Sequence, residues 1–182
     1  MKKRLFVSIP LPPEMMSVLS DYERNNLLPD VQWVNEENLH VTVFFCGDVE
    51  EADISRLDAR IGDALKGVRA FDLGWKEILF APPGKVKRMV WGEYHSNAGF
   101  DALAGTVYDA VKPFVDASIK KSRGRMIPHI TMARFKNPAV ADKVRLPQTD
   151  PGMLNVRNVE LMSSELKPEG SLYTVLSSYA LI

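Results

Sequence analysis

The chain has 182 residues, a length that suits one domain or two closely packed lobes around a real hydrophobic core. With 46% hydrophobic and 25% charged residues it has the composition of a folded globular protein, and no apolar run approaches the roughly 20 residues that a membrane-spanning helix needs. The 23 Lys and Arg residues balance the 23 Asp and Glu residues, which excludes a global positive field that would attract long nucleic acids. We therefore expect a cytoplasmic protein whose contacts with nucleic acid are local.

In the first part of the chain, strand signals alternate with a helical segment. Residues 4–9 predict a strand that stops at Pro10, and the prolines that follow suit the start of a helix reaching about Leu27. Two further strands are predicted over 31–34 and 39–45, because both runs are rich in β-branched and aromatic residues.

The middle of the chain carries two amphipathic helices and a hairpin. Apolar residues recur every three or four positions over 54–65 and again over 100–114, where the second helix should end or kink at Pro113. Between these helices, residues 71–80 and 87–94 are predicted as adjacent strands with a tight Ala-Pro-Pro-Gly connection.

The last part of the chain is strand-like over 126–135, 154–166 and 172–181. Many of the predicted strands follow one another directly, whereas a doubly wound parallel sheet would need helices at more regular intervals. We therefore expect an α+β fold built on antiparallel or mixed sheets.

The single cysteine, Cys46, excludes an internal disulfide and a multi-cysteine zinc site. We interpret it as a small buried apolar side chain. A nucleophilic pair of Cys46 with His40 is excluded, because six residues of extended strand would separate them by about 20 Å.

Two of the three histidines open the same four-residue pattern, His40-Val-Thr-Val and His129-Ile-Thr-Met. The chain has only five threonines, so the chance that two histidines are both followed by threonine at the second position is about 0.2%. We interpret the pattern as a repeat. The third histidine, His95, is interpreted as an exposed residue at the end of a strand.

Strand geometry explains the spacing within the repeat. Side chains at positions i and i+2 leave the same face of a strand, and those at i+1 and i+3 leave the other. Each histidine thus shares a face with its threonine, while the apolar residues between and after them face a core. Similar surroundings for His40 and His129 suggest two related halves that present matching strands to one cleft.

Two imidazoles that face one bound group suit acid–base catalysis, in which a neutral ring takes a proton and a protonated ring gives one. A cyclic phosphate needs both transfers at once. The threonine hydroxyls can donate hydrogen bonds to the non-bridging phosphate oxygens, where negative charge accumulates. Neither motif contains a carboxylate or a second histidine, so we expect no metal and no cofactor.

The motifs and their surroundings resemble the bacterial and archaeal RNA 2′,3′-cyclic phosphodiesterases, also called 2′-5′ RNA ligases, of the two-histidine phosphoesterase superfamily. The resemblance rests on Arg-Leu-Phe-Val-Ser-Ile-Pro near the start, on Trp-Val-x-x-Glu-Asn-Leu-His-Val-Thr-Val, and on Pro-His-Ile-Thr-Met-Ala-Arg-Phe. It extends from Arg4 to Tyr173.

The resemblance implies a bilobal α+β fold in which residues 1–182 form one domain of two intertwined, pseudo-symmetric lobes. Their antiparallel or mixed sheets would face a central cleft, with the helices on the outside. Each lobe would give one motif strand to that cleft.

The resemblance also implies roles for the site residues. His40 would be the proton donor to the 3′ leaving oxygen, and His129 the acceptor that activates water, so that a 2′-phosphate remains. Thr42 and Thr131 would bind phosphate oxygens. Arg134 would contact the phosphate, although its strand parity requires a twist, a bulge or the strand's end. From the residues alone, the symmetry of the motifs leaves open which histidine donates.

We therefore expect a monomeric enzyme that hydrolyses the 2′,3′-cyclic phosphate at RNA 3′ ends, with reverse 2′-5′ ligation as a side activity. One alternative substrate is a small nucleotide-derived cyclic phosphate. Another alternative is a module that binds RNA ends without turnover. The basic runs over 120–125 and at Lys85, Lys87 and Arg88 are interpreted as exposed loops that could meet RNA phosphates.

Overall fold

The computed structural model describes residues 1–24, 28–116, 119, 126–146, 149–167 and 170–182. Within these residues, strands and helices follow one another in a mixed order. Their bounds are β1 (Lys2–Pro10), α1 (Pro13–Arg24), β2 (Val31–Trp33), η1 (Glu36–Asn38), β3 (His40–Glu50), α2 (Glu51–Leu65), β4 (Phe71–Leu73), β5 (Trp75–Ala81), β6 (Met89–Tyr94), α3 (Ala98–Val111), β7 (His129–Phe135), η2 (Pro138–Lys143), β8 (Leu154–Val156), β9 (Asn158–Lys167) and β10 (Gly170–Ala180).

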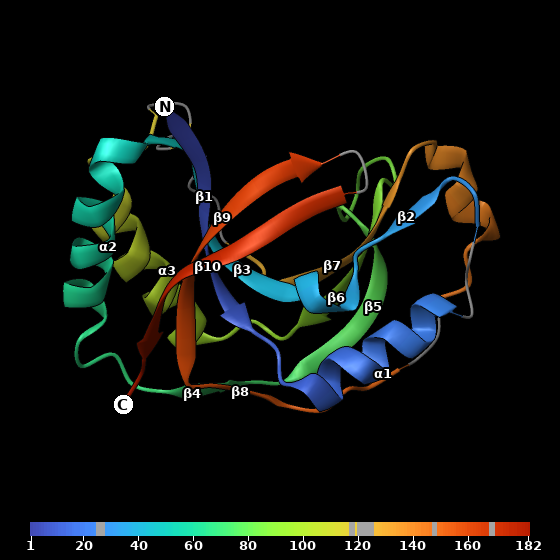
Figure 1. Cartoon of the computed structure of the whole chain (residues 1–182). Coiled ribbons are helices and arrows are strands. Elements are labelled where there is room, and N and C mark those ends of the chain that lie inside the picture. Colours follow the sequence, from blue (N-terminus) through green and yellow to red (C-terminus); the bar gives the residue numbers. More distant parts are fainter. Residues whose placement is uncertain (25–27, 117–118, 120–125, 147–148, 168–169) are drawn as a thin grey trace.

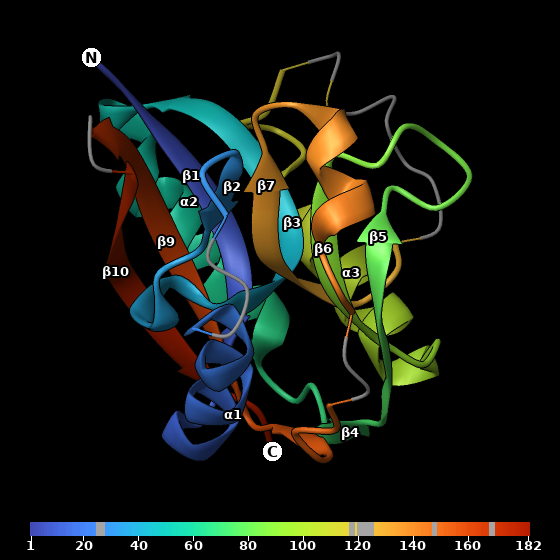
Figure 2. The same cartoon turned by 90° about the vertical axis from the view of Figure 1, so that its right-hand side faces the viewer.

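The main sheet has the strand order β10-β9-β1-β3-β7-β6-β5, with β2 attached through β7. Figure 2 shows β3, β7 and β6 side by side near its middle. Neighbouring strands in this sheet run antiparallel. The predicted α+β fold with antiparallel strands is therefore confirmed.

The sheet has two halves that meet at a single described bridge. One half contains β10, β9, β1 and β3, and the other contains β7, β6, β5 and β2. Between β3 and β7 the described register consists of the pair Val41 and Ile130. The two motif strands are therefore adjacent at the middle of the molecule.

The helices lie at the outside of the sheet. Figure 1 shows α2 and α3 together at one side of the molecule and α1 at the other. In α2 the predicted apolar stripe is confirmed, since Leu57, Ile61 and Leu65 are buried. In α3 the Asn97 side chain accepts a hydrogen bond from the Phe100 backbone N–H and so caps the first turn.

The predicted hairpin is right in its pairing and wrong in its extent. Strands β5 and β6 pair antiparallel, but the strand predicted over 71–80 is interrupted at Gly74. Its first part, β4, pairs instead with β8 in a separate two-stranded sheet. The connection from β5 to β6 spans 82–88, longer than the tight turn that the prolines indicate. The first predicted helix is described up to Arg24, and its expected end at Leu27 lies outside the described residues.

The cysteine prediction is confirmed, because Cys46 is fully buried. Burial raises the pKa of its thiol to about 12, so the reactive thiolate is not formed near neutral pH. In the described part of the chain, no helix combines the length and the apolar character needed to cross a bilayer.

Two leucines of β9 test which face of this strand packs on the core. Leu161 is 0% exposed and Leu166 is 75% exposed. Leu161→Ala should lower the free energy of unfolding by about 2–5 kcal/mol, because it removes buried methyl groups and leaves a cavity. Leu166→Ala should change it by less than about 0.5 kcal/mol. Urea denaturation measures both, and equal losses would contradict the assigned faces of β9.

Candidate active site

The alternation predicted for the motif strands is confirmed. In β3, Val41 and Val43 are 0% exposed, while His40 and Thr42 on the other face are partly exposed. In β7 the same pattern holds, with Ile130 buried between a partly exposed histidine and threonine. Each strand is therefore anchored on one face and open on the other.

The bridge between the halves brings the two motifs together. Val41 pairs with Ile130 in an antiparallel register. The residues that flank such a pair lie opposite each other, so this register places His40 across from Thr131, and Thr42 across from His129. The two motifs are thus related by a pseudo-twofold axis that passes through the bridge.

A β-bulge in β7 gives Arg134 access to the same face. Thr131 pairs with Trp91 and Ala133 with Val90, so Met132 is the extra residue. Met132 and Ala133 are consequently both buried in succession, and the side-chain parity shifts by one position. The bulge, one of the three solutions expected for Arg134, therefore turns this side chain to the exposed face.

The five residues predicted for the site line one cavity of about 650 Å³. They are His40, Thr42, His129, Thr131 and Arg134. A cavity of this size falls in the range of small-molecule sites. The structure thus brings both motifs and the arginine together around one space.

Several other cavity residues had not been predicted. Phe45, Trp91 and Tyr173 bring aromatic rings from three strands, and Asp101 and Tyr108 come from α3. These residues line the cavity because of the way in which strands and helices pack together. For most of them, no local pattern in the sequence predicts this position. The one available signal is a matching position in the two motifs, since Phe45 follows the first histidine at the same spacing as Arg134 follows the second.

The backbone orients both imidazoles in the same way. His40 Nδ1 lies 2.7 Å from the carbonyl oxygen of Asn38, and His129 Nδ1 lies 2.7 Å from that of Ile127. A carbonyl only accepts hydrogen bonds, so we assign the proton to Nδ1 in both rings. Nε2 is then the nitrogen that can exchange a proton with a ligand. In the free protein, His40 Nε2 lies 3.1 Å from Thr42 Oγ1.

Aromatic side chains fix the two rings differently. His129 stacks on Trp91 with ring centroids 3.7 Å apart and an interplanar angle of 21°. His40 is 5.0 Å from the Phe6 ring and meets Tyr173 edge-on at 5.5 Å. The surroundings of the two imidazoles are therefore not symmetric, although their backbone contacts are.

Burial dominates the electrostatics of both imidazoles. It lowers the pKa of His40 from the ordinary 6.5, and the positive charges of His129 and Arg134 lower it further against the opposing hydrogen bond to Asn38. Burial also lowers the pKa of His129, where the bond to Ile127 and the Glu93 carboxylate oppose it. Both rings are therefore mainly neutral at pH 7 without ligand, and a bound anion would favour their protonated forms.

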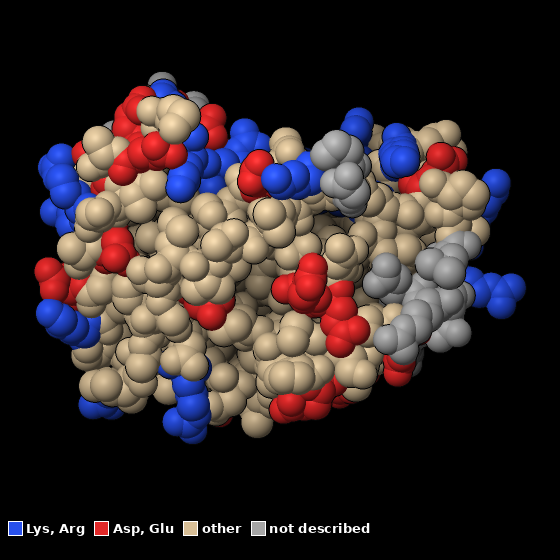
Figure 3. Space-filling model, in the orientation of Figure 1, with Lys and Arg blue, Asp and Glu red and all other residues tan. Residues whose placement is uncertain are grey.

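The other basic groups considered above do not line the cavity. Lys87 pairs with Asp142 at 3.6 Å, and the exposed His95 is not among the lining residues. The basic run 120–125 lies outside the described residues. On the face shown in Figure 3, positive and negative groups are interspersed around a largely uncharged surface. Within the described ranges, no three His, Cys, Asp or Glu side chains are grouped so that they could hold a metal ion.

Comparison with known proteins gives sequence relatives along most of the chain. The RNA 2′,3′-cyclic phosphodiesterase of Methanothermobacter thermautotrophicus is 29% identical over 188 aligned residues, which cover 100% of both chains. The protein of the same name from Archaeoglobus fulgidus is 31% identical over 147 residues, which cover 79% of this chain and 80% of the relative.

Solved structures share the fold. The crystal structure of TT0787 of Thermus thermophilus has a TM-score of 0.83 at 27% identity and covers 98% of this chain and 97% of its own. The structure of E. coli LigT complexed with NADP+ has a TM-score of 0.79 at 23% identity, with coverage of 100% and 99%.

The family assignment follows from the extent of these matches. The profile of the 2'-5' RNA ligase superfamily matches residues 22–167, which contain both histidine motifs and Arg134. The resemblance predicted from the motifs is confirmed, and the chain belongs to the 2'-5' RNA ligase superfamily.

Proposed function

We propose that this chain is an RNA 2′,3′-cyclic phosphodiesterase that converts the cyclic phosphate at an RNA 3′ end to a 2′-phosphomonoester. The observation that carries the proposal is the pair His40 and His129, whose Nδ1 atoms are tied to backbone carbonyls and which both line one cavity. The names of the relatives from Methanothermobacter and Archaeoglobus support a hydrolase of this class.

In the proposed reaction, His129 Nε2 takes a proton from water as the water oxygen forms a bond to phosphorus. The bond from phosphorus to O3′ breaks, and His40 Nε2–H gives its proton to O3′. In-line displacement needs the attacking and leaving oxygens on opposite sides of phosphorus. The pseudo-twofold relation of the two motif strands supports such a placement.

The remaining polar groups suit the charge of the phosphate. The Thr42 and Thr131 hydroxyls can donate hydrogen bonds to the non-bridging oxygens, and Arg134 supplies a positive charge on the same face. Neutralising that charge matters most when the fifth bond to phosphorus forms. We propose that these groups suffice without a metal or a cofactor.

The cavity supports recognition of the terminal nucleotide of an RNA. Phe45 and Tyr173 offer aromatic surfaces on which a base can stack, a mode that tolerates different bases. A cavity of about 650 Å³ does not hold a longer RNA, so the rest of the strand would lie outside it. A cyclic mononucleotide should therefore also be accepted. We propose that the enzyme acts as a monomer in the cytoplasm.

Loss of either catalytic histidine should slow turnover strongly. His40→Ala and His129→Ala should each lower kcat on a cyclic-phosphate oligonucleotide by about 10²–10⁴-fold, because a positioned proton donor or acceptor is removed. His95→Ala is the matched control and should retain full activity, since its exposed ring lies outside the cavity. The assay contains a chelator and identifies the product as a 2′-phosphate.

The same assay separates the competing functions. Full activity in His40→Ala, or a 3′-phosphate product, would overturn the proposed mechanism. Tight RNA binding by a wild-type protein that never turns over, unaffected by loss of both histidines, would indicate a binding module instead.

The pH profile of kcat/KM should be bell-shaped with its maximum below about pH 6.5. The reaction needs one neutral and one protonated imidazole, and this state is most populated midway between the two pKa values. Burial lowers the pKa of both His40 and His129 from 6.5 in the free protein, so the midpoint lies below that value. Initial rates at low substrate concentration, from about pH 4.5 to 8.5, measure the profile. A maximum above about pH 7 would contradict it.

Reverse ligation should use the same site. The groups that open the ring with water can open it with an RNA 5′-hydroxyl in the place of water. The 5′ oxygen then forms the bond to phosphorus while His129 takes its proton, and the bond to O3′ breaks while His40 protonates O3′, so that a 2′-5′ bond remains. We propose this as a side activity that disappears in His129→Ala together with hydrolysis. Incubation of the variant with a ligation-competent pair of RNA ends measures it. Ligation that persists without hydrolysis would show that the two activities do not share a site.

A further inference from the structure

The two catalytic histidines face different partners across the sheet. In the β6–β7 ladder, His129 lies directly opposite Glu93. In the β1–β3 ladder, His40 lies directly opposite Pro10. The pseudo-twofold relation makes these positions equivalent, so one half has a carboxylate where the other half has a proline. The difference in charge between the two positions therefore follows from the register in which the strands pair.

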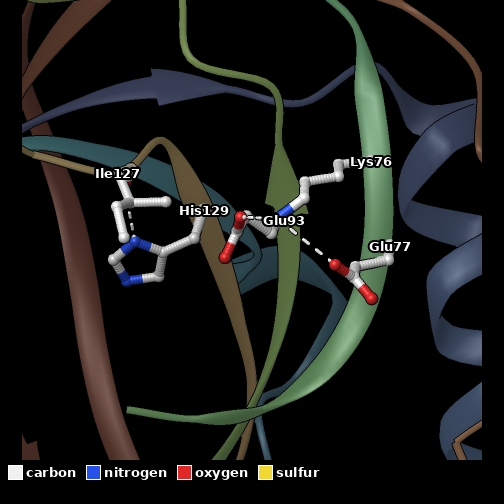
Figure 4. Close-up of polar contacts among 5 residues, drawn as sticks. All are labelled: Lys76, Glu77, Glu93, Ile127 and His129. Atoms are coloured by element: carbon white, nitrogen blue, oxygen red, sulfur yellow. Dashed lines mark hydrogen bonds and ion pairs between the residues drawn. The ribbon is translucent and has the colours of Figure 1, made fainter. Parts of the chain in front are cut away.

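Glu93 is an unusual carboxylate. It is 7% exposed, and no other Asp, Glu, Lys or Arg side chain in the described part of the chain is buried. Its Oε1 lies 2.6 Å from Lys76 Nζ of the neighbouring strand β5. Figure 4 shows Glu93 between His129 and the Lys76 ammonium, with Glu77 on the far side of the lysine. A carboxylate in this position is costly unless it is paired, and Lys76 supplies the pair.

We propose that Glu93, held by Lys76, is a positioning residue that stabilises the protonated form of His129 during the reaction. The inference rests on the proposed role of His129 as the proton acceptor. Glu93 acts through its charge and not through a hydrogen bond to the ring nitrogen, because His129 Nδ1 already donates to the Ile127 carbonyl. That bond sets the orientation of the ring, and the nearby negative charge favours the imidazolium.

The groups that face His129 from the surrounding elements give this charge a clear effect. Arg134 on the same strand opposes protonation, and His40 across the bridge is a second base that becomes positive when protonated. From α3 and β10 the cavity receives Asp101, Tyr108 and Tyr173. Glu93 is the carboxylate whose charge raises the pKa of His129 against burial.

No comparable carboxylate supports His40 among the described residues. The charged groups that act on its pKa are His129 and Arg134, and both lower it. Of the two rings, His129 has a carboxylate that favours its protonated form, which suits His129 to the role of base and His40 to that of acid. Protons would flow from water to His129 and from His40 to the leaving oxygen, which is the direction that hydrolysis to a 2′-phosphate requires.

Lys76 has the complementary task of holding the Glu93 carboxylate in place. Its ammonium contacts Glu93 at 2.6 Å and the more exposed Glu77 at 3.3 Å. These two carboxylates raise the pKa of Lys76, so it stays charged across the working range. The positive charge of Lys76 in turn offsets the desolvation cost of burying the Glu93 carboxylate.

The test is a titration of the histidine rings by NMR in wild type and Glu93→Gln. Glutamine keeps the size of the side chain and an oxygen that accepts from Lys76, but it removes the charge. The pKa of His129 should fall by about one unit, and that of His40 by no more than a few tenths. With a cyclic-phosphate substrate, kcat should fall about tenfold while KM stays within about twofold. The exposed His95 serves as an internal reference.

Two further variants complete the design. Glu77→Gln removes a carboxylate that contacts the same lysine but is 54% exposed in its side chain, and it should leave both the His129 pKa and kcat unchanged. Lys76→Met removes the counter-charge of Glu93 and should move the pKa of His129: upward while the Glu93 carboxylate stays ionised, and downward, as in Glu93→Gln, where the unpaired carboxylate takes up a proton. This variant decides the question if Glu93→Gln does not fold.

Three results would overturn the inference. They are an unchanged His129 pKa in folded Glu93→Gln, an equal shift in Glu77→Gln, and an unchanged His129 pKa in Lys76→Met. The titration needs no turnover, so a wild-type protein that fails to cleave cyclic phosphates would refute the proposed function and leave the test of Glu93 intact.

Discussion

The structure depends on one antiparallel bridge, between Val41 of β3 and Ile130 of β7. Each of these residues follows a motif histidine, and each is completely buried. The bridge therefore joins the two halves of the sheet, anchors both motif strands from below and places the two histidines across from the opposite threonines. Away from this pair, β3 continues along β1 and β7 along β6, so the open faces of the halves surround the cavity.

Both motif strands carry a bulge at the same position after the histidine. In β3 the extra residue is Val43, and in β7 it is Met132. The shift in parity brings Arg134 to the open face in one half and Phe45 in the other. The same kind of β-bulge thus places a cation in the half that contains β7 and an aromatic side chain in the half that contains β3. This combination suits a ligand with a phosphate and a base.

The local part of this site could be predicted from sequence, and the non-local part could not. The pairing of His40 with Thr42 on one strand face follows from a period of two, so it required no knowledge of neighbouring strands. The place of Arg134 depends on a bulge that no residue type marks. Glu93 reaches the site through the pairing of β6 with the distant β7, and Tyr173 through the β9–β10 hairpin, which joins the sheet where β9 pairs with the distant β1. The break at Gly74 was missed for the same reason, since β4 is defined by its partner β8.

A symmetric pair of histidines would have no preferred direction of proton flow. The repeated motif gives two rings with equal spacing and equal backbone contacts. Their difference comes from the strands beside them, where β6 presents a carboxylate to one ring and β1 a proline to the other. Since a general base improves as its pKa rises and a general acid as its pKa falls, this difference favours one assignment of roles over its mirror image. In the proposed mechanism, the two motif strands β3 and β7 provide the two imidazoles, and the strands beside them, β1 and β6, decide which imidazole takes a proton and which gives one.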